Sequence, residues 1–283
     1  MKTPERGPRP AGSVFEADWL SLREDVDHRS RSAELVAPVV REWRARGWRR
    51  IVDLGSGTGS NVRYLAPRFP QPQEWVLVDH DPELLEHARM PQEAGSPVRI
   101  TGDLAQEGLH AIADVDLCVA AALLDLVSES WIKSVIEICA RGSRGALFST
   151  TYDGTVAWDG SAPDADDDLV VELLNRHQTR DKGLGAALGP RAALTARAGF
   201  EQIGYRTWLV PSPWRLGARD LALAERLVDG WTAAATEEGH PREAGRIERW
   251  AIRKKSALAE GAVTLVVGHL DLLALPPVGR PLG

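Results

Sequence analysis

The stretch IVDLGSGTGSN, residues 51–61, constrains the fold of this chain more than any other feature. A short apolar run ends near the acid Asp53. Glycines then follow at every second position: Gly55, Gly57 and Gly59. Glycine adopts backbone conformations that other residues resist, and it lets the backbone approach a ligand closely. The stretch therefore predicts a strand, a glycine turn and a helix, with a ligand against the turn.

Strand-like and helix-like patterns alternate on both sides of this turn. The strand-like runs span residues 49–54, 74–79, 98–101, 116–123 and 145–151. Helical periodicity separates them, and one helix is marked by Asp81 as its N-cap and Pro82 in its first turn. Such alternation predicts a doubly wound α/β fold, in which helices cover both faces of a mostly parallel sheet.

Composition and charge exclude several classes of function. A formal net charge of −6 argues against nucleic acid as a partner, and the 43% hydrophobic and 26% charged residues are typical of a soluble globular protein. The longest apolar runs fall short of the about 20 residues that cross a bilayer, so no membrane partner is expected. Cys118 and Cys139 lie in apolar runs without metal-ligand spacing. They predict buried, reduced thiols and a cytoplasmic location.

The residues around the glycine turn discriminate between two ligands. A dinucleotide-binding turn would carry its third glycine where Ser60 stands. The carboxylate of Asp53 would repel a pyrophosphate, but it suits the ammonium and sulphonium charges of S-adenosylmethionine. Asp79, at the end of the second strand, can accept hydrogen bonds from a ribose in either ligand. The sequence therefore predicts an S-adenosylmethionine site.

Four segments resemble the successive motifs of class I S-adenosylmethionine-dependent methyltransferases. They are VDLGSGTGSN, VLVDHDPELLEHAR, ITGDLA and DLCVAAALLDLVS, and the resemblance covers about residues 48–150. It implies methyltransferase activity, a Rossmann-like seven-stranded sheet with strand order 3-2-1-4-5-7-6, and a reversed last strand. The final apolar run at 262–275 fits that last strand.

The resemblance also implies which residues hold the cofactor. The methionine moiety passes Asp53, Gly55, Gly57 and Gly59, the ribose meets Asp79 with His80 beside it, and the adenine meets Asp103 and Leu104; the fourth strand contributes Ala120 and Ala121. Plainer interpretations stay open, because Asp79 can cap a helix and Asp103 can start a turn. Arg23, in an N-terminal helix, either binds the methionine carboxylate or belongs to a solvated helix face.

Two charged segments suggest binding sites, but each has a simpler structural interpretation. The arginine-rich residues 41–50 invite an RNA-binding role, but a helix C-terminus favours cations in any case. The acidic residues 164–168 invite a divalent metal, but a solvated loop before a helix is the simpler interpretation. No metal site is predicted.

One domain over residues 15–283 is expected after a disordered leader at 1–14, which lacks the apolar core of a signal peptide. Its parts are an N-terminal helical cap (15–46), a cofactor-binding core (48–210), a helical insertion (211–260) and a last strand (261–278). The helices of the insertion are expected to cover the acceptor side or an oligomer interface, and a homodimer stays open.

The predicted reaction is O- or N-methylation of a small molecule. No Asn-Pro-Pro-Tyr signature of nucleobase methyltransferases follows the fourth strand; LLDLVS stands there and places Asp125 near the transferred methyl. The loop at 176–190 contains Gly183, Gly185 and Gly189 and is predicted to position the acceptor, with His177 as a candidate base. Two alternatives stay open: a non-catalytic protein that binds S-adenosylmethionine, and a methyltransferase for RNA or protein.

Overall fold

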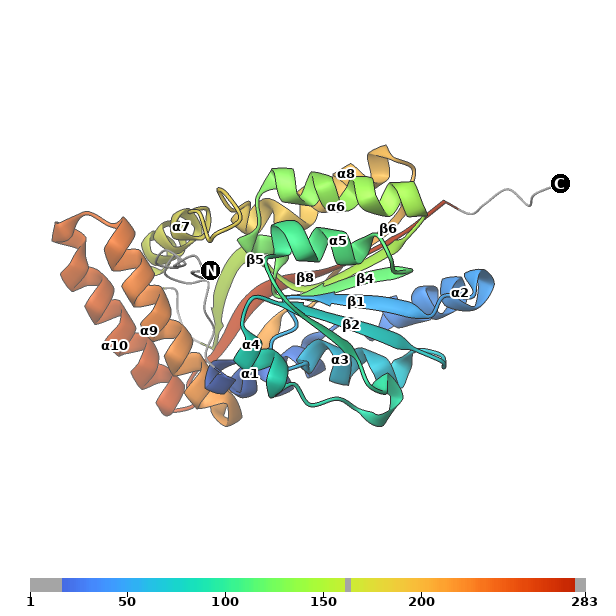
Figure 1. Cartoon of the computed structure of the whole chain (residues 1–283). Coiled ribbons are helices and arrows are strands. Elements are labelled where there is room, and N and C mark those ends of the chain that lie inside the picture. Colours follow the sequence, from blue (N-terminus) through green and yellow to red (C-terminus); the bar gives the residue numbers. More distant parts are fainter. Residues whose placement is uncertain (1–16, 161–163, 278–283) are drawn as a thin grey trace, which may run out of the picture.

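A central sheet with helices on both faces forms the main body of the protein (Figure 1). The computed structural model describes residues 17–160 and 164–277, so the leader predicted at 1–14 lies outside the described residues. The strands are β1 (Arg50–Leu54), β2 (Glu74–Asp79), β3 (Val98–Thr101), β4 (Leu117–Ala121), β5 (Gly145–Asp159), β6 (Arg206–Pro211), β7 (Trp214–Leu216) and β8 (Thr264–Leu275).

The strand order is β3-β2-β1-β4-β5-β8-β6, and it confirms the predicted order, with the last strand inserted between the fifth and sixth. Strands β1 to β5 pair in parallel, whereas β8 runs antiparallel to both β5 and β6. The parallel strands therefore end at the same edge of the sheet, which is where ligands bind in doubly wound folds.

The sheet has eight strands rather than the predicted seven. The additional strand, β7, lies inside the segment 211–260 that we expected to be helical, and it pairs with β8 through Trp214 and Val267. Trp214 and Leu216 are buried while Arg215 between them is exposed. This alternation is the period of a strand, but over three residues it is too short to stand out in the sequence.

The helices cover both faces of the sheet. They are α1 (Ala17–Ser30), α2 (Val36–Arg46), α3 (Ser60–Leu65), α4 (Pro82–Glu86), α5 (Leu109–Ile112), α6 (Glu129–Gly142), α7 (Asp167–Gln178), α8 (Ala192–Gln202), α9 (Leu221–Glu238) and α10 (Ala244–Ala259). Helices α5, α6 and α8 lie on one face and α1 to α4 on the other (Figure 1). The predicted cap of α4 is confirmed, because Asp81 Oδ1 accepts a hydrogen bond of 2.9 Å from the Glu83 amide.

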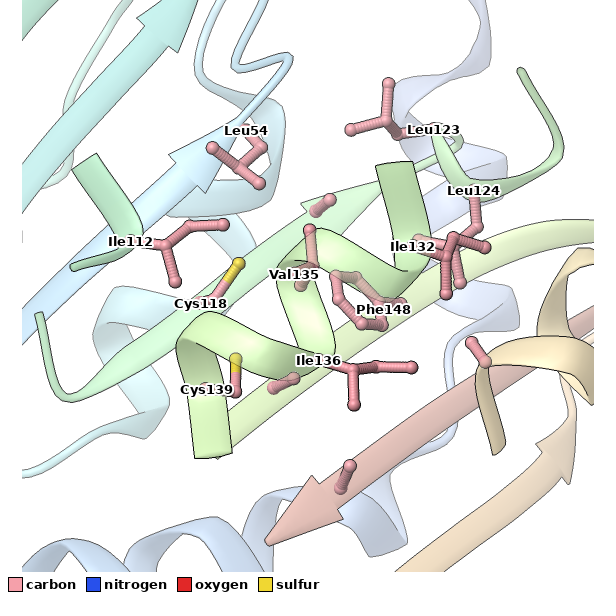
Figure 2. Packing of buried hydrophobic residues seen from close by; sticks show 14 of the residues in the cluster. Leu54, Ile112, Cys118, Leu123, Leu124, Ile132, Val135, Ile136, Cys139 and Phe148 are labelled. Carbon is pink, nitrogen blue, oxygen red and sulfur yellow. The ribbon is translucent and has the colours of Figure 1, made fainter. Parts of the chain in front are cut away.

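The core of the first face lies between α6 and the parallel strands (Figure 2). Helix α6 directs Ile132, Val135 and Ile136 at this core, where Phe148 of β5 packs among them. Cys118 and Cys139 are both fully buried free thiols, as predicted. Burial raises the pKa of Cys139 to about 12, so this thiol stays protonated and packs as a small apolar group.

A second apolar cluster lies beyond the ends of the parallel strands. Strands β5 and β8 are long enough to extend into it, and α1, α7, α9 and α10 pack around their extensions (Figure 1). Trp250 of α10 and Val228 of α9 are among its fully buried side chains. The helices predicted at 211–260 therefore rest on the sheet extension and do not form a separate unit.

The acidic segment at 164–168 is tied to α10. Asp164 pairs with Arg253 at 2.7 Å, and Asp167 pairs with Lys254 at the same distance. Within the described residues, no group of three or more His, Cys, Asp or Glu side chains is arranged to hold a metal ion. None of the helices in residues 17–160 and 164–277 combines the length and the apolar character required to cross a membrane.

Candidate active site

A cavity of about 610 Å³ lies at the carboxyl ends of β1, β2 and β4. The turn after β1, Asp79 at the end of β2, residues 101–104 after β3 and residues 121–123 at the end of β4 form one side. Helix α1 and the loop at 182–184 form the other side. The cavity therefore joins the segments that carry the predicted cofactor residues with two segments from elsewhere in the chain.

The glycine turn brings its backbone to the cavity. Gly55 and Gly57 both line the cavity and have positive φ values of 66° and 50°. The Gly57 amide donates a hydrogen bond of 2.7 Å to Asp79 Oδ2. A Cβ atom at Gly57 would lie 3.0 Å from Leu20 Cδ1, so α1 crosses the turn closely. Both the conformation and the close approach require glycine here.

Gly59 has a structural role in the turn, and its predicted contact with the cofactor stays a prediction. It does not line the cavity, whereas its neighbours Thr58 and Ser60 do. Its φ is 85°, and a Cβ atom there would lie 2.4 Å from Met90 Cε. Gly59 thus permits a left-handed N-cap for α3 and the close packing of the segment that follows α4.

Asp53 is fully buried and does not line the cavity. Its Oδ1 atom accepts a hydrogen bond of 2.6 Å from Asn61 Nδ2, and its Oδ2 atom has no hydrogen-bond partner. Burial raises the pKa of Asp53 to about 7. Asn61 lines the cavity, and its buried Oδ1 atom also lacks a partner. Asp53 therefore orients Asn61, and Asn61 is the polar group that faces a ligand.

Asp79 lies at the position expected for a ribose-binding acid. It lines the cavity, and Asp81 rather than Asp79 caps α4. Burial alone would raise the pKa of Asp79, but hydrogen bonds from His80 and from the Asp81 and Gly57 amides outweigh it and hold that pKa below its usual value. His80 also lines the cavity, with Nδ1 at 3.2 Å from Asp79 Oδ1.

Asp103 and Leu104 both line the cavity after β3. Asp103 Oδ1 accepts a hydrogen bond of 2.5 Å from the Ala105 amide, so this residue also forms the turn that was the alternative interpretation. The two roles are compatible, because the second carboxylate oxygen is not used by that bond. Glu107 lines the cavity as well and accepts the Asp103 amide at 2.8 Å.

At the end of β4, the cavity-lining residues start one position later than predicted. Ala120 is buried and does not line the cavity, whereas Ala121 and Ala122 do. Ala122 has a φ of 52°, and its amide donates a hydrogen bond of 2.9 Å to the Ser149 carbonyl. The chain turns at Ala122, and this turn moves the following residues toward the cavity.

Helix α1 closes the cavity over the glycine turn. Arg63 of α3 pairs with Glu24 of α1 at 2.6 Å, and His28 Nε2 lies 3.0 Å from the Ser60 carbonyl oxygen. Arg23 lines the cavity, but two of its nitrogens bond the Asp27 carboxylate at 2.8 and 3.1 Å.

Arg31 is a cavity residue that we did not predict. It is 8% exposed, and its Nε and Nη1 atoms have no hydrogen-bond partner. Burial lowers the pKa of Arg31, and the nearby carboxylates of Asp271 and Asp27 oppose this effect. A buried guanidinium with unpaired donors is suited to a carboxylate ligand. The only sequence signal was its place in the charged run after α1.

The two predicted catalytic residues lie in different surroundings. Asp125 is 8% exposed, its Oδ1 atom lacks a hydrogen-bond partner, and burial raises its pKa to about 6 although Arg23 and Lys182 act against this. It follows the cavity-lining Leu123 by two residues. His177 does not line the cavity, and its Nε2 lies 3.4 Å from Glu237 Oε2 of α9. Neither residue lines the cavity, but Asp125 stands between Leu123 and Leu126, which do, whereas His177 faces α9.

The loop at 176–190 reaches the cavity through residues 182–184. Its three glycines, Gly183, Gly185 and Gly189, all have positive φ values. The loop is held in place by backbone pairing between Asp181 and Ala186 and between Ser128 and Ala187. Part of this loop therefore lies at the cavity, and its role in positioning an acceptor stays a prediction.

The cavity residues fit S-adenosylmethionine. Asp79 can accept the ribose hydroxyls, and Asp103 can accept the adenine amino group. The unpaired donors of Arg31 suit the methionine carboxylate, and the unpaired Oδ1 of Asn61 suits the ammonium group. Four groups of matching chemistry thus lie along one cavity.

Comparison with known proteins agrees with this chemistry. Residues 51–144 match the family model described as a methyltransferase domain. A search of curated proteins finds no match. Solved structures similar to this chain include the YcgJ protein of Bacillus subtilis, with 13% identity, a TM-score of 0.46, and coverage of 88% of this chain and 100% of that one.

A methyltransferase of Geobacter sulfurreducens in complex with S-adenosylhomocysteine has 15% identity, a TM-score of 0.44, and coverage of 92% of this chain and 98% of that chain. The match to a methyltransferase domain covers residues 51–144, and the strand order and the cavity agree with an S-adenosylmethionine-dependent methyltransferase.

Proposed function

We propose that this methyltransferase acts on a small molecule and methylates an oxygen or nitrogen atom. The observation that carries the proposal is the size of the cavity, about 610 Å³, which would hold both the cofactor and the acceptor. Helix α1 and the loop at 182–184 form part of its wall. Small-molecule sites typically measure about 300–1,000 Å³. A cavity of this size accommodates a cofactor and a compact acceptor.

Apolar side chains contribute to the walls of the cavity. Leu20 of α1, Leu126 and Leu184 are among them. Such walls exclude water and suit an acceptor with an apolar or aromatic body. They also hold the acceptor near the sulphonium, and orientation alone can lower the barrier by as much as about 7–11 kcal/mol in ideal cases.

A macromolecular acceptor has less support. The arginine-rich segment at 41–50 ends where β1 begins, at the opposite end of that strand from the glycine turn. Two of its arginines are in ion pairs: Arg46 with Glu42, and Arg50 with Glu74 at 3.7 Å. RNA docked on this segment would therefore lie at the far end of the sheet from the cavity.

Asp125 is the proposed proton acceptor. S-adenosylmethionine supplies the electrophilic methyl group, and an oxygen nucleophile must lose a proton as it attacks. Asp125 has a pKa of about 6 and an unpartnered buried oxygen. At neutral pH it is mostly ionised and ready to accept a proton, and the proton it gains is tolerated because burial favours the neutral acid.

The test is release of S-adenosylhomocysteine during incubation with a panel of phenols, amines and hydroxy acids. Release with panel members, and none with transfer RNA or a protein mixture, would support the proposal. Release only with RNA or protein would contradict it in favour of a macromolecular acceptor. Binding of S-adenosylmethionine without release on any acceptor would favour a protein that binds the cofactor without catalysis.

A further inference from the structure

Lys182 stands out among the charged groups that line the cavity. It comes from the glycine-containing loop between α7 and α8, and its side chain is half-buried. Within residues 17–160 and 164–277, its ammonium group has no hydrogen-bond partner, although the carboxylates of Glu237, Glu238 and Asp125 act on its charge. Burying a cation without a hydrogen-bond partner costs free energy. A ligand that supplies such a partner to Lys182 removes part of this cost and therefore binds more tightly.

The carboxylates around Lys182 are already committed to other groups. Glu237 and Glu238 both pair with Arg180. Asp181 Oδ1 accepts the Gly183 amide at 2.7 Å, within the loop itself. Their charges still act on Lys182, but none of them is its hydrogen-bond partner, and burial together with Arg180 lowers the pKa of Lys182.

Two further charged groups act near Lys182. Asp125 is buried, and the charges of Lys182 and Arg23 both act on it. Arg23 is largely neutralised by its two bonds to Asp27. Lys182 is thus a cation of the cavity wall that has no hydrogen-bond partner in the described part of the chain and can give its hydrogen bonds to a ligand.

We propose that the methyl acceptor carries a carboxylate that pairs with Lys182. This inference rests on the proposed small-molecule function and narrows its substrate class. A carboxylate is favoured over a phosphate dianion because a single ammonium group matches one negative charge, and the nearby carboxylates of Asp125 and Glu237 would repel a second. The leucine-lined walls would hold the apolar body of such an acid.

The experiment compares matched carboxylates and uncharged amides. The probes are 4-hydroxybenzoate with 4-hydroxybenzamide, and indole-3-acetate with indole-3-acetamide. Their dissociation constants are measured with saturating S-adenosylhomocysteine for the wild type, Lys182→Met and Lys182→Arg. Lys133→Met is the control, because Lys133 is exposed and pairs with Glu129 on α6.

We expect at least one carboxylate to bind about tenfold more tightly than its amide in the wild type, as one charge-assisted contact provides. The ratio of the amide's dissociation constant to that of the carboxylate should fall to about 1 in Lys182→Met. In Lys182→Arg and Lys133→Met it should stay close to the wild-type value. No preference in the wild type, or the same preference in Lys182→Met, would overturn the proposal. If the wild type does not bind S-adenosylhomocysteine at all, the proposed function itself is contradicted.

Discussion

Asn61 Nδ2 lies 2.6 Å from Oδ1 of the fully buried Asp53, so the acid of the glycine-turn motif acts through an amide and not directly on the cavity. Both residues keep one unpartnered oxygen, and only Asn61 lines the cavity. The charge of Asp53 still acts on a cationic ligand, because Asp53 is fully buried directly behind Asn61. This arrangement links cofactor binding to the protonation of Asp53.

The first prediction concerns the pH dependence of cofactor binding. A cationic ligand favours ionised Asp53, and the pKa of this carboxyl is about 7 in the free protein. Binding should therefore release a proton below pH 7, and affinity for S-adenosylmethionine should rise with pH and level off above about 7. Between pH 6 and 7.5 the rise should be about fivefold to tenfold in calorimetric titrations.

Asp53→Asn is the matched variant for this prediction. The affinity of this variant for S-adenosylmethionine should depend less on pH. The ligand's own amino group titrates equally in both experiments, so its contribution cancels in the ratio of wild-type to variant affinity. 5′-Methylthioadenosine, which lacks the amino-acid part, should bind both proteins with little pH dependence. Parallel profiles for the wild type and Asp53→Asn would exclude a role for Asp53.

The second prediction distinguishes the two arginines of the cavity. Arg31→Met should weaken S-adenosylmethionine binding by about tenfold to a hundredfold, because its buried donors lose a charge-assisted bond to the methionine carboxylate. Arg23→Met should have a smaller effect, because Arg23 is already bonded to Asp27. Affinity for 5′-methylthioadenosine should not change in either variant. The reverse order would assign the carboxylate to Arg23.

The third prediction concerns the proton acceptor. Asp125→Asn should lower turnover by about a hundredfold or more while cofactor affinity stays within a few-fold. In the wild type the rate should rise with pH through about 6, because Asp125 must be ionised and its pKa is about 6. His177→Ala should be nearly as active as the wild type, since His177 faces Glu237 outside the cavity. A large fall in turnover for His177→Ala alone would restore it as the base.

The fourth prediction separates the structural from the binding role of glycine. Gly59→Ala should lower the free energy of unfolding by about 1–2 kcal/mol from its positive φ, and by a smaller further amount because a Cβ atom there would lie 3.3 Å from the Arg89 carbonyl oxygen. Gly47→Ala is the control, because Gly47 has a φ of 69° and a Cβ atom added there would have no neighbour within 4 Å. Denaturant unfolding should show the larger loss in Gly59→Ala, with cofactor affinity retained. Equal losses would show that the close contacts at Gly59 add no cost to that of its positive φ.

The parallel half of the fold could be predicted from the sequence because its signals are local. Each strand end, the glycine turn and the Asp81 cap lie within a few residues of one another, so Asp79, Asp103 and Leu104 were placed at the cavity. The short strand β7 was missed because it depends on pairing with β8, some fifty residues later in the chain.

The residues that close the site were harder to predict for the same reason. Arg31 lines the cavity only because α1 lies over the glycine turn, held by contacts such as Arg63 with Glu24. His177 has the residue type of a base, but the rotation of α7 directs it toward α9. Residue type and spacing along the chain do not report such tertiary orientations.

Binding of S-adenosylmethionine through Asp79 is the central claim for this protein. The most direct measurement is the shift in melting temperature on adding S-adenosylmethionine or NAD to the wild type and to Asp79→Ala. We predict a clear rise with S-adenosylmethionine and none with NAD, because a ligand that binds only the native state stabilises it. The rise should be strongly reduced in Asp79→Ala. Equal stabilisation by NAD, or an undiminished rise in Asp79→Ala, would contradict the claim.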